Sequence, residues 1–179
     1  MKAIITASIA TMALGGIIMA MKKSAIQGGG KYFTIAELCR SATASAKGID
    51  NTPTAEIKAN LQQLIDKVLD PVRSRYGKPI IVTSGYRCPA LEAVVSGAGS
   101  SQHMTGCAAD LQPTTGGALA DIFRACVAIN NYDQLIIEEN ERGARWVHVS
   151  YSPTNRRGMM LAYKGGRYIR INSDWENWI

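Results

Sequence analysis

The hydrophobic positions in the first half of the chain repeat with the period of a helix. Between residues 53 and 75, apolar side chains recur every three or four positions, and they are Ile57, Leu61, Leu64, Ile65, Val68, Leu69 and Val72. This pattern predicts one long amphipathic helix. Thr52 as the N-cap and Pro53 at the first helical position predict where it begins, and Pro71 predicts a kink near its end.

Shorter patterns predict the remaining elements. Thr34, followed by Glu37 three residues later, is typical of a capping box at the start of a short helix. A second amphipathic helix is expected at residues 117–129. Strand patterns occupy 80–83, 134–138 and 145–151, and a last hairpin pairs 159–163 with 167–171. Helices come first and antiparallel strands dominate later, so the sequence predicts an α+β fold with helices packed on a small antiparallel sheet.

The start of the chain differs in character from the rest. Residues 3–21 carry no charge and have lysines on both sides. With a rise of about 1.5 Å per residue they could just span a hydrocarbon core of about 30 Å, so a signal-anchor ranks ahead of a cleaved signal peptide and a buried helix. The predicted domains are a hydrophobic segment at 1–23, a flexible linker at 24–30 and a globular domain at 31–179.

Composition and charge are those of an ordinary globular protein. Of the 179 residues, 46% are hydrophobic and 19% are charged, which excludes wholesale disorder. The net charge of +6 suits a polyanionic partner, but the basic residues are scattered and no nucleic-acid binding is expected. The cysteines at 39, 88, 107 and 126 form no CxxC pair. They permit two disulfides, although four isolated thiols are favoured.

Candidate metal ligands follow from the scarcity of histidine. The chain has two histidines, His103 and His148. Asp110 lies seven positions after His103, with Gly106 between them to permit a turn. Two imidazoles and one carboxylate make three protein ligands, which leave a fourth zinc position for water as in catalytic sites. Taken singly, a histidine in a strand is more often packed or solvated than bound to a metal.

The three candidate ligands lie within a series of short sequence motifs. In chain order they are Phe33-Thr34 with Glu37-Leu38, Asn60-Leu61, Leu69 to Arg73, Ser84 to Arg87, Ser101 to Asp110, Asp133 to Ile136 and Trp146 to Ser150. Together they resemble the M15 zinc peptidases, which include D-Ala-D-Ala carboxypeptidases and phage-type L-Ala-D-Glu endopeptidases. The resemblance implies the Hedgehog/DD-peptidase-like fold, cleavage of peptidoglycan peptides, and one zinc ion held by His103, Asp110 and His148.

The resemblance also implies roles for two residues near these ligands. Arg87 is expected to face the substrate and to hold a carboxylate or the developing oxyanion, because a guanidinium is always charged and offers a planar fork of donors. The alternative for Arg87 is a structural ion pair. Ser101 is expected to donate a hydrogen bond to substrate or to brace the metal loop, and the alternative is a serine that caps the loop.

The chain departs from the better-known branches of the family at the general base. Those branches carry an acidic residue three positions before the second histidine, where this chain has Arg145. If the strands around this position pair as a hairpin, Glu138 lies nearly opposite His148 and shares its face, while Glu139 points to the other face. Glu138 is therefore predicted as the base that activates the attacking water.

These inferences predict a zinc-dependent hydrolase of peptidoglycan peptides, either a phage lysin or a wall-remodelling enzyme. It would be anchored in a membrane through residues 3–21 or exported to the periplasm or cell wall. The missing acid before His148 keeps open a catalytically inactive peptidoglycan-binding module of the same fold. A basic membrane or nucleic-acid accessory protein ranks last, because it leaves the histidines and the aspartate unexplained.

Overall fold

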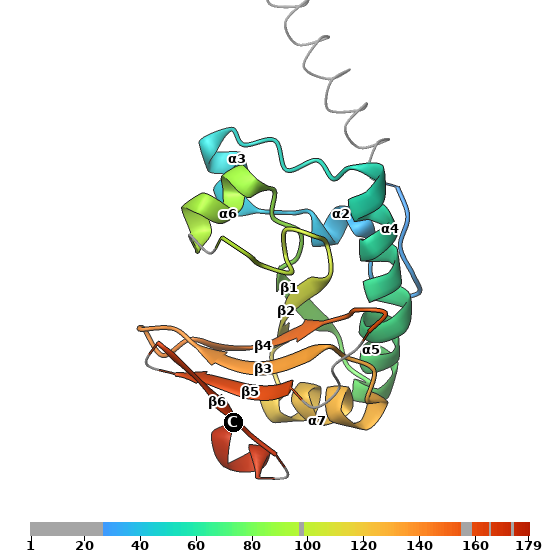
Figure 1. The fold of residues 1–179 in the computed structure, drawn as a ribbon. Helices are drawn as coiled ribbons and strands as arrows, with labels where there is room; N and C mark the ends of the chain where they lie inside the picture. The colour runs from blue at the N-terminus through green and yellow to red at the C-terminus, as the bar shows by residue number, and fades with distance from the viewer. Residues whose placement is uncertain (1–26, 97–98, 155–158, 165, 173) are drawn as a thin grey trace, which may run out of the picture.

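The computed structural model describes residues 27–96, 99–154, 159–164, 166–172 and 174–179 (Figure 1). The hydrophobic segment expected at 3–21 lies outside these residues, as does the first part of the expected linker. Within the described ranges, no helix has both the length and the apolar character needed to cross a membrane.

Six strands form one sheet in the order β1-β2-β4-β3-β5-β6. They are β1 (Ile80–Ser84), β2 (Ala108–Pro113), β3 (Gln134–Glu139), β4 (Arg145–Ser150), β5 (Met159–Lys164) and β6 (Arg167–Arg170). The four strands β1, β2, β4 and β3 are antiparallel, which confirms the predicted α+β fold. The last hairpin extends this sheet, with β5 parallel to β3 and β6 antiparallel to β5.

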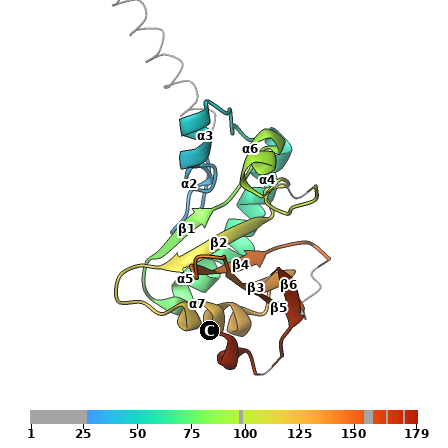
Figure 2. The same ribbon diagram turned by 90° about the vertical axis from the view of Figure 1, so that its left-hand side faces the viewer.

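Helices lie on both sides of this sheet. They are α2 (Ile35–Leu38), α3 (Ala42–Lys47), α4 (Ala55–Leu64), η1 (Ile65–Leu69), α5 (Asp70–Tyr76), α6 (Pro89–Val95), α7 (Leu119–Ile129) and η2 (Trp175–Trp178). In the views of Figures 1 and 2, α7 lies below the strands, and α2, α3 and α6 lie above them. The molecule therefore has a helical layer on either side of the strands that carry the candidate ligands.

The predicted long helix is present, with a π-helical turn in its middle. The segment η1 joins α4 to α5 without a break in the helical backbone. Pro71 follows this turn; it lacks an N–H, and its ring conflicts with the carbonyl four residues earlier, that of Lys67. The Asn131 side-chain amide donates to this Lys67 carbonyl at 3.0 Å. Widening of the helix and this external donor together accommodate the proline.

The predicted start of this helix is wrong by two residues. The N-cap is Thr54, whose hydroxyl accepts a hydrogen bond from the Ile57 backbone N–H at 3.3 Å. Thr52 instead donates its hydroxyl to the Asp50 carboxylate at 2.6 Å. The sequence has a threonine on each side of Pro53. The hydroxyl of the first, Thr52, is bonded to the Asp50 carboxylate, and the second, Thr54, caps the helix.

The glycines expected in the linker pack against the helical layer. Gly29 donates its N–H to the side-chain oxygen of Gln62, and accepts from the Gln62 amide nitrogen, both at 3.0 Å. A Cβ on Gly30 would collide with the Asp70 carboxylate, 2.1 Å away. Residues 28–30 are therefore held by α4 and α5, and this part of the predicted linker belongs to the globular unit.

The sheet separates core side chains from site side chains. Six residues with at most 2% exposure face the hydrophobic core, and they are Ala109, Leu111, Leu135, Ile137, Val147 and Val149. Successive side chains of a strand point to opposite faces, so Asp110, Glu138 and His148 project from the other side. The packed face holds the backbone on which these polar groups stand.

Candidate active site

Three potential ligand atoms converge above the sheet. His103 Nε2 lies 3.2 Å from His148 Nδ1, which lies 3.0 Å from Asp110 Oδ1. The third side of the triangle, from His103 Nε2 to Asp110 Oδ1, is 3.4 Å. Ligand atoms of a tetrahedral zinc ion with bonds of about 2.0–2.1 Å are about 3.3–3.4 Å apart. These three atoms therefore have the spacing needed to hold one metal ion.

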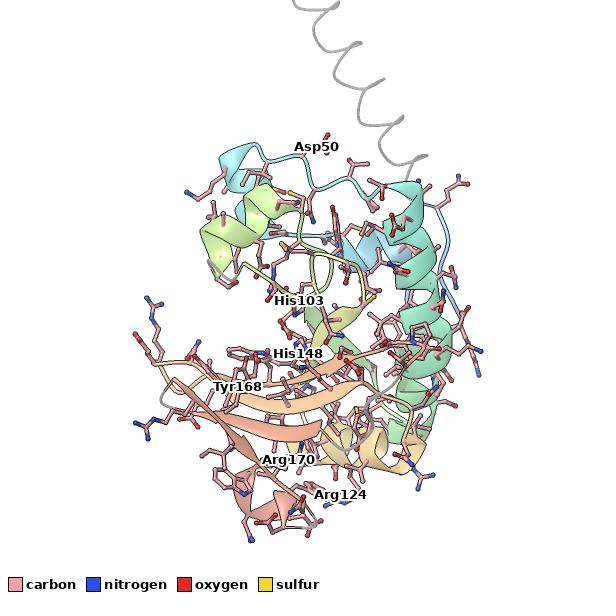
Figure 3. All side chains as sticks on the ribbon, in the orientation of Figure 1. Asp50, His103, Arg124, His148, Tyr168 and Arg170 are labelled. Atoms are coloured by element: carbon pink, nitrogen blue, oxygen red, sulfur yellow. The ribbon has the colours of Figure 1, made fainter. Side chains whose placement is uncertain are left out.

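Two strands and one loop bring these residues together. Asp110 on β2 and His148 on β4 are directly paired across the sheet. His103 comes from the loop between α6 and β2, and Figure 3 shows it above the sheet position of His148. The loop turns at Gly106, which has φ 71° and accommodates the Ile57 carbonyl where a Cβ would come within 2.9 Å. Glycine is required here both for the left-handed backbone and for the close approach.

A backbone carbonyl fixes the orientation of His103. Its Nδ1 lies 2.7 Å from the Gly85 carbonyl oxygen. A carbonyl can only accept, so Nδ1 carries the hydrogen and Nε2 presents its lone pair to the other two groups. This arrangement is the usual support of a metal-binding histidine. Glycine is needed at position 85, because a Cβ there would lie 2.2 Å from the Leu38 carbonyl oxygen.

The cluster keeps its carboxylate ionised. Burial alone would raise the pKa of Asp110, but the positive charge that His103 and His148 carry when protonated, together with their hydrogen bonds, outweighs it and holds this pKa well below its usual range. Burial would lower the pKa of His148, but the hydrogen bond and charge of Asp110 raise it above its ordinary value. A negative group between two imidazoles favours a bound cation.

The three residues lie in the wall of a cleft of about 1220 Å³. The loop above the sheet contributes Ser101, Gln102, Met104 and Thr105, and the sheet contributes Gln134, Ile136, Glu138, Trp146, Tyr163 and Tyr168. Arg87 and Glu92 line the cleft as well. A peptide-sized ligand in this cleft would therefore meet the candidate metal site directly.

Sequence comparison places this site in a known family. The sequence model of the family described as Peptidase M15 matches residues 31–150. The chain belongs to the Peptidase M15 family. No curated protein matches the chain. The matched range contains the three potential ligands and Arg87, whereas β5, β6 and η2 follow it.

In this M15 domain, Arg87 has both an internal partner and a place in the cleft. Its Nε lies 2.5 Å from the Glu92 carboxylate, and its Nη1 donates to the Ser84 hydroxyl at 2.8 Å. Nη1 is also 3.8 Å from Asp110 Oδ2. The Arg87 side chain is 12% exposed and the Glu92 side chain 2%. The structural ion pair that was the alternative for Arg87 exists. It fixes the guanidinium beside His103, Asp110 and His148, the three potential ligands that are called the metal cluster below.

Asn51 is a site residue that sequence reasoning missed. Its buried side-chain amide donates to the carbonyls of Cys39 and Tyr86, each at 2.9 Å. Its Oδ1 accepts from the Cys88 backbone N–H at 2.8 Å. These bonds tie both neighbours of Arg87 to the end of α2. Nothing in the local sequence, an asparagine before Thr-Pro, distinguishes this role from that of an ordinary loop residue.

Glu138 shares the face of the metal cluster, but in a different register from the one predicted. Ile136 lies opposite His148, and Glu138 lies opposite Trp146. The offset is two residues, so Glu138 keeps the predicted face and lines the cleft. Burial raises the pKa of Glu138 above its ordinary value, and the charge of His148 opposes this only in part.

The turn between β3 and β4 explains this register. The Asn140 side-chain oxygen accepts from the N–H groups of Arg142 and Ala144, both at 3.0 Å, and closes the turn. Gly143, with φ 76°, completes it. Glu139 points to the opposite face, as predicted, where its carboxylate lies 3.5 Å from the Nε of Arg145.

Ser101 supports the loop that carries His103. The Ser101 hydroxyl accepts from the His103 N–H at 3.3 Å, and its carbonyl accepts from Met104, so it braces the metal loop. Ser101 also lines the cleft.

All four cysteines are free thiols, as favoured from sequence, and Cys107 is the one that is only partly buried.

Proposed function

We propose that this M15 protein is a zinc-dependent peptidase that cleaves peptide bonds in peptidoglycan stem peptides. The observation that carries the proposal is the triangle of His103 Nε2, His148 Nδ1 and Asp110 Oδ1, with sides of 3.0–3.4 Å, in the wall of an open cleft. Three protein ligands with an open side are the arrangement of catalytic rather than structural zinc.

The chemistry of the donors fits zinc better than other common ions. Two imidazole nitrogens and one carboxylate oxygen suit a borderline ion such as Zn²⁺. Calcium and magnesium require six or more oxygen ligands, which His103 and His148 do not supply. The Gly85 carbonyl on His103 Nδ1 adds the outer support typical of such sites. His103, Asp110 and His148 would therefore hold the ion.

The chain's own residues supply the remaining parts of a peptidase. When bound, zinc supplies Lewis acidity toward the scissile carbonyl and lowers the pKa of water. Glu138 takes a proton from the attacking water and delivers it to the leaving amine, and its raised pKa suits both transfers. Arg87, fixed by Glu92 and Ser84, binds a substrate carboxylate or the developing oxyanion. Ser101 orients substrate at the loop side of the cleft.

Peptidoglycan peptides suit the charge and shape of the protein. The stem peptides carry free carboxylates, and the chain has a net charge of +6 with Arg87 in the cleft. We place the enzyme at a membrane, anchored by residues 3–21, or in the periplasm or cell wall. Nucleic acid is not among the proposed partners, because the basic residues form no stripe with exposed aromatics.

Digestion of purified muropeptides, with products identified by mass spectrometry, tests this function. The zinc-loaded protein should release defined peptide products, and a chelator should abolish their release. The matched control is His148→Ala, which should fail with or without added zinc. Absence of any product from zinc-loaded wild type would refute the peptidase.

A second candidate is an inactive peptidoglycan-binding module of the same fold. The observation in its favour is Arg145, which stands where better-known branches carry an acid and which faces Glu139 away from the metal cluster. Binding of intact muropeptides without cleavage, at full zinc occupancy, would support the module over the enzyme.

A further inference from the structure

One row of side chains crosses four strands beside the metal cluster. Trp146 on β4 is paired with Glu138 on β3, which is paired with Tyr163 on β5, which is paired with Tyr168 on β6. Directly paired residues share a face of the sheet, so all four lie on the same face as His148. The row leads from the proposed base to β6, the strand at the edge of the sheet.

The two tyrosines at the end of this row form an aromatic pair. Their ring centroids are 4.7 Å apart, with an angle of 46° between the ring planes. Tyr163 is partly buried, whereas Tyr168 is 59% exposed. Both rings line the cleft that contains His148 and Glu138, and Figure 3 labels Tyr168 to the left of His148. Because Tyr168 is packed against Tyr163 in the wall of the cleft and is also exposed, its ring is available to a ligand that enters the cleft.

The position of the pair limits what it could bind. Neighbouring strands are about 4.8 Å apart, so the backbones of Tyr163 and Tyr168 lie about 5 and 10 Å from that of Glu138. An extended peptide advances about 3.4 Å per residue. The pair therefore meets a group attached within about three residues of the bond that is cut.

The chemistry of the rings selects the kind of group. An aromatic face carries partial negative charge, so it attracts C–H groups and disfavours carboxylates, which are the common side groups of a stem peptide. A pyranose offers a flat C–H face to the rings and hydroxyls at its edge, and tyrosine offers an apolar body with a polar tip. The sugar that carries the stem peptide has this shape and lies next to the first peptide residue, so it is within reach of the pair when the bond that is cut lies within about three residues of the sugar.

We propose that Tyr163 and Tyr168 form a saccharide subsite, which binds the sugar attached to the stem peptide and so directs cleavage toward glycosylated substrate. The inference rests on the proposed function. The subsite comes from β5 and β6, which follow the residues 31–150 matched by the Peptidase M15 family.

A comparison of two substrates tests the subsite. The value of kcat/KM is measured for a disaccharide-linked stem peptide and for the same peptide without sugar. Wild type should prefer the glycosylated form by about three- to tenfold, the size of one aromatic contact. Tyr168→Ala should bring this ratio toward one, and Tyr168→Phe should keep it. Tyr32→Ala is the matched control, because Tyr32 is also exposed but does not line the cleft.

Binding of the peptide-free disaccharide provides a readout that is independent of turnover. The chelator-treated protein is titrated with the disaccharide. The intrinsic tryptophan fluorescence, to which Trp146 of the row contributes, is followed. Saturable binding that Tyr168→Ala weakens supports the subsite, whereas no binding, or equal binding by both proteins, overturns it. Equal wild-type rates on the two substrates would overturn the subsite and leave the peptidase standing. If neither substrate is cleaved, the peptidase fails and the disaccharide titration alone decides the subsite.

Discussion

Asp110 and His148 face each other across β2 and β4, with Asp110 Oδ1 3.0 Å from His148 Nδ1. Their neighbours Ala109, Leu111, Val147 and Val149 point into the core and are fully buried. A slip of one residue in either strand would turn the polar group of that strand into the core and its apolar neighbours into the cleft. Core packing therefore enforces the register that places two of the three proposed ligands together.

Removal of the metal should destabilise the protein. A ligand that binds only the folded state adds about 2.7 kcal/mol when its concentration is one hundred times Kd. Chelation should therefore lower Tm by several degrees, and one equivalent of zinc should restore it. In His148→Ala, Tm should not respond to the chelator. A wild-type Tm that is indifferent to both chelator and zinc would contradict the metal site.

Glu138→Gln should abolish turnover and keep the fold. Loss of a positioned general base reduces rates by about 10²–10⁴-fold. Zinc content and Tm should remain close to wild type, because Glu138 is not one of the three clustered ligands. The matched control is Glu139→Gln, since Glu139 lies next in sequence and points to the other face of the sheet. Equal losses in the two variants would argue against Glu138 as the base.

The pH dependence of kcat/KM should report the same group. A general base acts only when deprotonated, so activity should be lost as pH falls through the pKa of Glu138. Burial raises this pKa above the ordinary glutamate value of 4.5, so the acidic limb should lie above that value. Glu139→Gln should leave the limb in place. A limb at or below the ordinary glutamate value would be inconsistent with a buried base.

The double role of Arg87 can be separated by a pair of substitutions. Arg87→Gln leaves the buried Glu92 carboxylate with the hydrogen bond from Ser96 but without a positive charge beside it, which should destabilise the fold by about 3–5 kcal/mol. Adding Glu92→Gln removes the uncompensated charge and should recover much of the free energy of unfolding. Activity should stay low in the double variant if the guanidinium contacts substrate. Activity that returns together with stability would make Arg87 purely structural.

Periodicity predicted which face each residue occupies better than it predicted register. The alternation along β3 places Glu138 and Glu139 on opposite faces whatever the turn, and the structure agrees. The partner of each residue depends on how the turn closes, and the Asn140 side chain determined that through two hydrogen bonds. Local patterns do not reveal such a side-chain contact in advance.

The metal cluster was predicted from motifs, and its supports were not. His103, Asp110 and His148 were accessible to sequence reasoning because histidine is scarce and the motifs occur in family order. Glu92 was not, because the pairing of a buried glutamate with Arg87 depends on α6, a short helix that carries little periodic signal. Its clearest sequence mark was Cys88-Pro89, where the proline occupies the first turn.

Asn51, which was not predicted from the sequence, can be tested directly as a residue that positions Arg87. Asn51→Ala leaves the carbonyls of Cys39 and Tyr86 and the N–H of Cys88 without their partner. Each buried group left unpaired costs about 1–3 kcal/mol, so the free energy of unfolding should fall by several kcal/mol. Asn51→Asp should also be destabilising, because a carboxylate cannot donate to two carbonyls.

The matched control for this test is Asn60→Ala. Asn60 makes one exposed hydrogen bond, from its side-chain amide to the Thr105 carbonyl, so its loss should cost no more than about 1 kcal/mol. Urea unfolding of the three variants measures the difference. Because Asn51 holds both neighbours of Arg87, kcat/KM of folded Asn51→Ala should fall more than that of Asn60→Ala. Comparable stabilities and rates in the two alanine variants would show that the buried amide does not position the arginine.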